Sequence, residues 1–225
     1  MEKIVVAVDG FSSCGKSTLA EQLADQLKYI FVDSGAMYRA ITLFFLRKNI
    51  DLNEKDAVKE ELKHIKLEFV NNESSTKSTL LLNGENVDGL IRDMTISDKV
   101  SEVAAIKEVR EFAVNQQRKM GEKKGLVMDG RDIGTTVFPN AELKIFVTAE
   151  PAIRATRRYK ELVETHPSIT LEEIAKNLEM RDYIDSHREV SPLRQAEDAI
   201  VLDNSYLTRE EQLAQALKWV EEKTI

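Results

Sequence analysis

The chain of 225 residues lacks several features that would assign it to a specialised class. Its single cysteine rules out an intramolecular disulfide and fits a reducing cytoplasm. Its longest apolar run is too short to span a bilayer, and no signal-peptide pattern precedes the first expected strand. Basic residues number 32 against 39 acidic ones, and the net charge of −7 argues against general binding to nucleic acid or acidic membranes. We therefore expect a cytoplasmic monomer without nucleic-acid or membrane partners.

The length and the hydrophobic content of 42% fit one domain with insertions better than two domains. Five short apolar segments alternate with helical patterns, and this order favours a mostly parallel α/β sheet with right-handed crossovers. The five expected strands are Ile4–Val8, Tyr29–Val32, Gly125–Met128, Leu143–Val147 and Ala199–Leu202.

Helical spacing predicts a helix over Met37–Leu46 and one long helical stretch from Ser97 to about Met120. A capping-box pattern at Thr208–Glu211 begins the last helix. The segment Lys66–Val87 interrupts the alternation with short strands, and Asn83-Gly84 is a tight-hairpin signal. We expect a small antiparallel meander inserted into the α/β domain as a separate lobe.

The segment from Gly10 to Ser17 matches G-x-x-x-x-G-K-[ST], the pattern of phosphate-binding loops (P-loops). In such a loop the backbone N–H groups surround phosphates, Lys16 reaches the β- and γ-phosphates, and the Ser17 hydroxyl ligates Mg²⁺. The expected strand before it and helix after it supply the required context. The alternative is a glycine turn that binds nothing. The residues expected to hold a nucleoside triphosphate are Gly10, Phe11, Ser12, Ser13, Cys14, Gly15, Lys16, Ser17 and Thr18.

A charged stretch from about Arg154 to Arg194 carries arginines at helical spacing. The first group is Arg154, Arg157 and Arg158, and the second is Arg181, Asp185 and Arg188. We expect each group to project onto one helix face, where like charges repel unless an anion lies between them. Phosphate would convert this repulsion into charge-assisted hydrogen bonds, as in a mobile cationic lid. The alternative is a solvated charged face.

Charged residues also follow two other expected strands. Asp129 ends a strand, where an acidic residue of a P-loop protein serves the water shell of Mg²⁺, and Arg131 lies close enough to contact a substrate phosphate. Asp33 and Ser34 begin a helix, and Arg39 near the same sheet edge indicates a second phosphate. Turn and cap geometry alone is the alternative explanation of the Asp and Ser residues.

The P-loop, Asp33–Arg39, Asp129–Pro139 and Arg181–Arg188 occur in an order that resembles nucleoside monophosphate kinases, most closely bacterial-type cytidylate kinases. The resemblance covers essentially the whole chain. It implies a single P-loop kinase domain with a five-stranded parallel core, a monophosphate-binding insert and an arginine-rich lid. The expected boundaries are 1–63, 91–150 and 195–225 for the core, 64–90 for the insert and 151–194 for the lid.

The resemblance also implies roles for individual residues. Ser34, Arg39, Arg131 and Arg188 would hold the acceptor phosphate, Asp185 and Arg181 would approach the ribose, and Ser101, Arg110 and Asp132 would face the base, with Tyr38 in the same acceptor site. Lys16, Arg131, Arg157, Arg158 and Arg188 would stabilise the moving phosphoryl group, and Ser17 and Asp129 would serve Mg²⁺. An Asp acceptor paired with an Arg donor suits the amino group and acceptor atoms of cytosine.

The expected reaction is therefore in-line transfer of the γ-phosphate of ATP to CMP or dCMP, with Mg²⁺. A kinase for UMP, AMP or shikimate, a GTPase-type switch and a nucleotide-dependent binding module are the alternatives. The sequence contains no Asn-Lys-x-Asp motif for reading guanine, which disfavours the switch. The P-loop departs from the family pattern Pro-Ser-Gly-Ala, because Phe11–Cys14 places Ser13 where the family has glycine. The backbone at Ser13 must therefore accept a Cβ.

Overall fold

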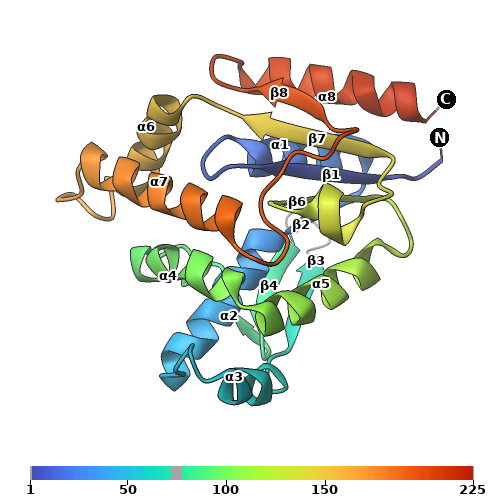
Figure 1. The fold of residues 1–225 in the computed structure, drawn as a ribbon. Coiled ribbons are helices and arrows are strands. Elements are labelled where there is room, and N and C mark those ends of the chain that lie inside the picture. Colours follow the sequence, from blue (N-terminus) through green and yellow to red (C-terminus); the bar gives the residue numbers. More distant parts are fainter. Residues whose placement is uncertain (1, 72–77, 225) are drawn as a thin grey trace.

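A sheet of five parallel strands forms the centre of the computed structural model, which describes residues 2–71 and 78–224 (Figure 1). The strands are β1 (Val5–Gly10), β2 (Ile30–Asp33), β6 (Leu126–Gly130), β7 (Leu143–Thr148) and β8 (Ile200–Asp203). Their spatial order is β2-β6-β1-β7-β8. All five predicted strands are confirmed, with ends shifted by at most two residues.

Helices cover both faces of this sheet (Figure 1). They are α1 (Lys16–Leu27), α2 (Ser34–Lys48), α3 (Lys55–Leu62), α4 (Met94–Ala105), α5 (Lys107–Gly121), α6 (Pro151–Leu162), α7 (Leu171–His187), α8 (Arg209–Lys223) and the π-helical turn η1 (Ile133–Val137). Successive residues of a strand point to opposite faces. Val6 and Val8 of β1 pack toward α1 and α8, whereas Val5 and Ala7 pack toward η1 and α5.

The predicted meander is present as β3 (Leu67–Asn71), β4 (Ser78–Leu82) and β5 (Glu85–Asn86), paired antiparallel. Both residues of its second turn have positive φ, 51° at Asn83 and 85° at Gly84, as the tight-hairpin signal predicts. The first connection of the meander, residues 72–77, lies outside the described residues. A hydrophobic cluster joins this small sheet to α2, α3, α4 and α5.

The single long helix expected from Ser97 to Met120 is wrong. The structure has two helices there, separated at Ile106, whose backbone is extended (φ −68°, ψ 125°). The break frees the carbonyl of Ala104 from the helical ladder, and Arg110 Nη1 donates a hydrogen bond to it at 3.2 Å. This turn of the chain directs the Arg110 side chain into the protein, where it is 1% exposed.

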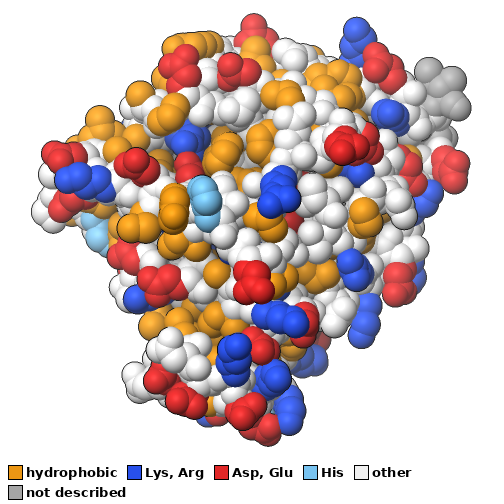
Figure 2. Space-filling view, in the orientation of Figure 1, with side chains coloured by type: hydrophobic (Ala, Val, Ile, Leu, Met, Phe, Trp, Pro, Cys, Tyr) orange, Lys and Arg blue, Asp and Glu red, His pale blue; other side chains and the backbone are white. Residues whose placement is uncertain are grey.

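The arginine-rich stretch forms α6 and α7, which pack on each other through the cluster of Ala155, Leu162, Ile174 and Leu178. A capping box between Thr170 and Glu173 begins α7. Acidic and basic side chains are interspersed over the face that Figure 2 shows. Across residues 2–71 and 78–224, no helix is both long and apolar enough to cross a membrane.

We expect Gly84→Ala to lower the free energy of unfolding by about 1 kcal/mol, because an L-residue with a side chain is strained at φ 85°. The matched control is Gly89→Ala, since an added Cβ meets nothing within 4 Å at either position and only Gly84 has positive φ. Urea denaturation of both variants measures the difference. Equal midpoints would show that the turn carries no such strain.

Candidate functional site

The carboxyl ends of the five strands meet at one edge of the sheet, where open α/β proteins bind ligands. The P-loop follows β1, Asp33 ends β2, Asp129 lies near the end of β6, and Asn204 follows β8. A cavity of about 670 Å³ opens there, a volume typical of small-molecule sites. The sheet topology therefore places residues from distant parts of the sequence around one ligand space.

Most of the predicted site residues line this cavity. They are Ser12, Ser13, Gly15, Lys16, Ser17, Thr18, Ser34, Tyr38, Arg39, Ser101, Arg110, Asp129, Arg131, Asp132, Arg157, Arg158, Arg181, Asp185 and Arg188. Gly10, Phe11 and Cys14 are not among the lining residues. Cys14 is buried in the core under α1, and Phe11 makes an edge-to-face contact with Phe146.

The P-loop has the backbone geometry of an anion cradle. Gly15, at the N-cap of α1, has φ 95° and leaves the first helical N–H groups without a side-chain cap. Ser13 has φ 58°, so the backbone does accept a Cβ in the left-handed region. Lys16 Nζ donates to the carbonyl of Phe11 at 3.0 Å. Burial and the neighbouring Arg131 lower the pKa of Lys16, while Asp129 and Asp33 act in the opposite direction.

Ser17 and Asp129 lie together, as predicted for a metal site. The Ser17 hydroxyl donates to Asp129 Oδ2 at 2.6 Å, while the buried Oδ1 has no hydrogen-bond partner. Burial and the nearby Asp33 raise the pKa of Asp129. A carboxylate with an unsatisfied oxygen beside a hydroxyl is a donor set that suits Mg²⁺, which completes its coordination with water and substrate phosphates.

Arg131 connects the P-loop to α7. Its Nε donates to Asp185 Oδ2 at 2.8 Å, and its Nη2 donates to the Ser12 hydroxyl at 2.7 Å. Burial raises the pKa of Asp185, but Arg131 and Arg188 outweigh that effect and hold it below its usual range. The guanidinium therefore lies between the loop expected to bind the triphosphate and the lid helix.

Two other predicted phosphate ligands lie at the end of β2. Arg39 pairs with Asp33 at 2.7 Å and has an unpartnered buried Nε. The Ser34 hydroxyl donates to the carbonyl of Asp129 at 2.6 Å, and Asp33 also caps α2 through the N–H of Ala36. The capping alternative is thus confirmed for Asp33, but it does not account for Arg39.

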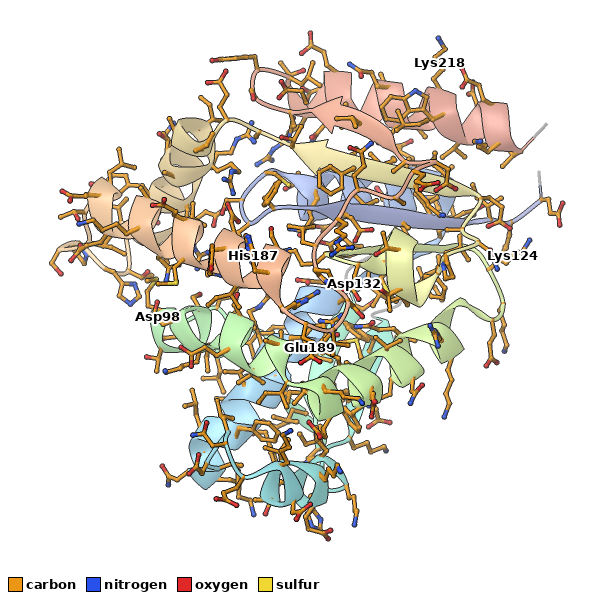
Figure 3. The ribbon with its side chains drawn as sticks, in the orientation of Figure 1. Asp98, Lys124, Asp132, His187, Glu189 and Lys218 are labelled. Atoms are coloured by element: carbon orange, nitrogen blue, oxygen red, sulfur yellow. The ribbon has the colours of Figure 1, made fainter. Side chains whose placement is uncertain are left out.

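A buried charged network forms the other end of the cavity, near the centre of the molecule (Figure 3). Asp132 accepts hydrogen bonds from Arg110 and, at 3.3 Å, from Arg188 Nη2. The Arg110 guanidinium carbon lies 5.3 Å from the centre of the Tyr38 ring, and burial raises the pKa of Tyr38 to about 12. The Ser101 side chain is buried and lines the same end.

The arginines of α6 reach different partners. Arg157 donates to the carbonyls of Cys14 (3.2 Å) and Asn204 (2.6 Å), and Arg158 donates to the Ser97 hydroxyl at 3.0 Å. Arg154 does not line the cavity, but it contacts the same loop as Arg157, because its Nη1 donates to the carbonyl of Ser12 at 3.2 Å. It also forms a 2.6 Å ion pair with Asp182 that joins α6 to α7.

The second group departs from the predicted face, because Arg188 lies beyond the end of α7 with extended backbone (φ −59°, ψ 145°). That turn directs its guanidinium to Asp132 and to the carbonyl of Ser191. Arg181 remains in the cavity with an unpartnered Nε, and burial together with Arg131 lowers its pKa to about 10. Closely spaced cations of this kind favour an anionic ligand.

Sequence reasoning missed several lining residues. They are Glu21, Arg92, Asn204, Leu207, Arg209 and Gln212. Asn204 donates to the carbonyl of Cys14 at 2.9 Å and so fixes the P-loop from the far end of the sheet. Its position directly after a parallel strand was the available signal, since strand ends share one edge. Arg209 lies within the capping-box pattern at Thr208–Glu211, which indicated only a helix start, and the others carry no motif.

The comparisons with known proteins agree with this geometry. The family model described as cytidylate kinase matches residues 6–222. The chain is 54% identical to a cytidylate kinase of Bacteroides thetaiotaomicron over 215 residues, which cover 94% of each chain. It is 52% identical to a cytidylate kinase of Flavobacterium johnsoniae over 223 residues, 98% of this chain and 97% of that one.

A solved shikimate kinase from Bacteroides thetaiotaomicron superimposes with a TM-score of 0.50 at 11% identity, covering 98% of this chain and 99% of that one. An uncharacterized protein from Eubacterium ventriosum gives a TM-score of 0.53 at 11% identity, covering 97% and 99%. At this identity the likeness concerns the fold alone. It agrees with the five-stranded parallel sheet of P-loop kinases.

We expect Gly15→Ala to weaken binding of a non-hydrolysable nucleoside triphosphate analogue by about tenfold or more. At φ 95° a Cβ is strained, and it would overlap the amide nitrogen of Asn204, so the loop must change shape. Isothermal titration calorimetry measures the dissociation constant, with Gly89→Ala as the control. An unchanged constant would show that the loop does not depend on this conformation.

Proposed function

The chain belongs to the cytidylate kinase family, and from that premise we propose that its cavity transfers the γ-phosphate of ATP to CMP or dCMP, giving ADP and CDP or dCDP. One observation carries the proposal. A single cavity runs from the P-loop to the buried pair of Arg110 and Asp132, with Arg131 between the two ends.

The donor triphosphate lies on the P-loop in this proposal. The free N–H groups at the start of α1 and the Lys16 side chain contact its phosphates. Arg157 exchanges the carbonyls of Cys14 and Asn204 for phosphate oxygens, because a hydrogen bond between two charged groups is stronger than one to a neutral carbonyl. Ser17 and Asp129 would hold Mg²⁺, which supplies positive charge to the phosphates when it is bound. The donor base extends toward Asn204, Leu207 and Gln212.

The acceptor phosphate lies among Arg39, Arg131 and Arg188, with Ser34 beside them. Each of these guanidiniums is paired with a carboxylate in the described structure, so binding exchanges or shares these partners. The Nε of Arg181 has no hydrogen-bond partner, so this atom can donate to the phosphate without first losing an existing bond. Asp185 and Arg181 lie on the lid side of this group, where the ribose would pass.

The base is read by Asp132, Arg110 and Ser101. The Asp132 carboxylate accepts from the cytosine amino group, and the Arg110 guanidinium donates to the ring acceptors. Uracil has a carbonyl in place of that amino group, so its binding would leave a buried carboxylate facing a lone pair. Such a mismatch disfavours the analogue by several kcal/mol. Tyr38 supports this end by packing its ring against Arg110.

The phosphoryl transfer needs no side chain that acts as a general base, because the acceptor phosphate is already anionic. Positioning and charge stabilisation supply most of the rate of phosphoryl transfer. Lys16, Arg131, Arg157, Arg158 and Arg188 neutralise charge on the moving group, and closure of α6 and α7 over the cavity excludes water. In this proposal the core covers residues 1–63, 91–150 and 195–225, the insert 64–90 and the lid 151–194. A monomeric state, a cytoplasmic location and the absence of nucleic-acid partners stay predictions.

Acceptor ranking tests the proposal. We expect ADP release in a coupled assay to depend on the acceptor, with CMP and dCMP far ahead of UMP, AMP and shikimate. The reason is that only cytosine offers an amino donor to Asp132 beside acceptors for Arg110. A preference for AMP would contradict the base assignment. ATP hydrolysis that CMP leaves unchanged would favour a switch or a binding module.

We expect Arg131→Ala to lower kcat by about 10²- to 10³-fold while the dissociation constant of ATP changes by less than about threefold. Arg131 serves the acceptor and the moving phosphoryl group, and its hydrogen bond to the P-loop is to the Ser12 hydroxyl rather than to the backbone expected to hold phosphate. Steady-state kinetics and calorimetry give the two values. The matched control is Arg47→Ala, which removes a surface ion pair with Glu85. A parallel loss of ATP binding would place Arg131 in the donor site.

A further inference from the structure

The turn η1 lacks the cap that its sequence would supply. Asp132 occupies the N-cap position of η1, and aspartate is among the best residues there because its carboxylate accepts the first free N–H groups. Asp132 makes no such bond. Both of its carboxylate oxygens are instead turned to the arginines Arg110 and Arg188.

A different aspartate caps η1 from the middle of the sheet. Asp9 Oδ1 accepts from the N–H of Ile133 at 2.8 Å, and its Oδ2 accepts from the N–H of Gly134 at 2.7 Å. Asp9 belongs to β1 and lies opposite Gly130 in the ladder with β6, so its backbone is fixed beside the chain that leads to Asp132.

This cap requires a carboxylate to be buried, which costs free energy. Burial raises the pKa of Asp9 to about 6, although the two N–H groups and Lys16 act in the opposite direction and Asp132 adds to the rise. Within the described residues, both hydrogen bonds of its carboxylate go to the start of η1. A carboxylate that is expensive to bury, and whose oxygens both hold one turn, indicates that the turn must be held in this way.

We propose that Asp9 is a positioning residue for acceptor specificity: it caps η1 in place of Asp132 and thereby lets the Asp132 carboxylate stay with Arg110 and Arg188 at the base site instead of turning back to η1. The inference rests on the base-reading role proposed above for Asp132. Without Asp9, the free N–H groups of Ile133 and Gly134 compete for the Asp132 carboxylate, which then turns from the base toward its own helix.

A double-mutant cycle with Asp9→Asn and Asp132→Asn tests this. The readout is the ratio of kcat/KM for CMP to that for UMP, which does not depend on the folded fraction of a variant. The asparagine amide keeps the size of Asp9 but can accept only one of the two N–H bonds. We expect Asp132→Asn to lower the ratio by about a hundredfold and Asp9→Asn by about fivefold. In the Asp132→Asn background, Asp9→Asn should leave the ratio unchanged.

Asp198→Asn is the matched control, because it removes a surface carboxylate that pairs with Lys144 and should leave the ratio at its original value. A ratio unchanged in Asp9→Asn but lowered in Asp132→Asn overturns the inference and leaves the base-reading role intact. Independent, additive effects in the double variant also overturn it. An unchanged ratio in Asp132→Asn removes the base-reading role itself, and the inference with it.

Discussion

In the ladder between β1 and β6, Val8 lies opposite Asp129 and Asp9 lies opposite Gly130. This parallel register makes both strands end at the same level, so the loop after β1 and the charged segment after β6 leave the sheet side by side. The contacts of Ser17 with Asp129 and of Arg131 with Ser12 both depend on it. A shift by one residue would turn the Asp129 side chain, which lies within β6, to the opposite face of the sheet. The elements proposed to hold donor and acceptor are therefore aligned by the backbone hydrogen bonds of the sheet.

The cavity gathers charged side chains, and other residues of the chain provide partners for only some of their hydrogen-bonding atoms. Asp33 and Asp185 pair with Arg39 and Arg131, while Arg181 keeps a buried guanidinium nitrogen without a partner. Each paired arginine keeps a carboxylate partner, whose attraction offsets part of the cost of burying the two charges. An incoming phosphate supplies the missing acceptors and forms stronger bonds than the backbone carbonyls that these cations also contact. The electrostatics thus favour a ligand that carries several negative charges.

Local patterns in the sequence predicted the five strands, the P-loop and the Asn83-Gly84 turn, because each depends on neighbouring residues. They also indicated which arginines gather at the cavity, since strand ends share one edge of a parallel sheet. The break at Ile106 and the burial of Arg154 were not predictable in this way. At the break, Arg110 bonds the carbonyl that leaves the helical ladder and is itself held by Asp132. Arg154 is held by Asp182 on α7 and by the carbonyl of Ser12 in the P-loop. Helical spacing alone carries no information on such partners.

The P-loop illustrates how distant contacts compensate for a local departure. Ser13 adopts φ 58°, a conformation that costs an L-residue with a side chain about 1 kcal/mol relative to glycine. The next carbonyl, that of Cys14, accepts hydrogen bonds from both Asn204 and Arg157, one following β8 and the other on α6. These two bonds hold the peptide between Cys14 and Gly15, one residue beyond Ser13, and so restrain the loop next to its strained backbone. Because Arg157 is one of these two donors, the position of α6 and the conformation of the P-loop are coupled through the Cys14 carbonyl.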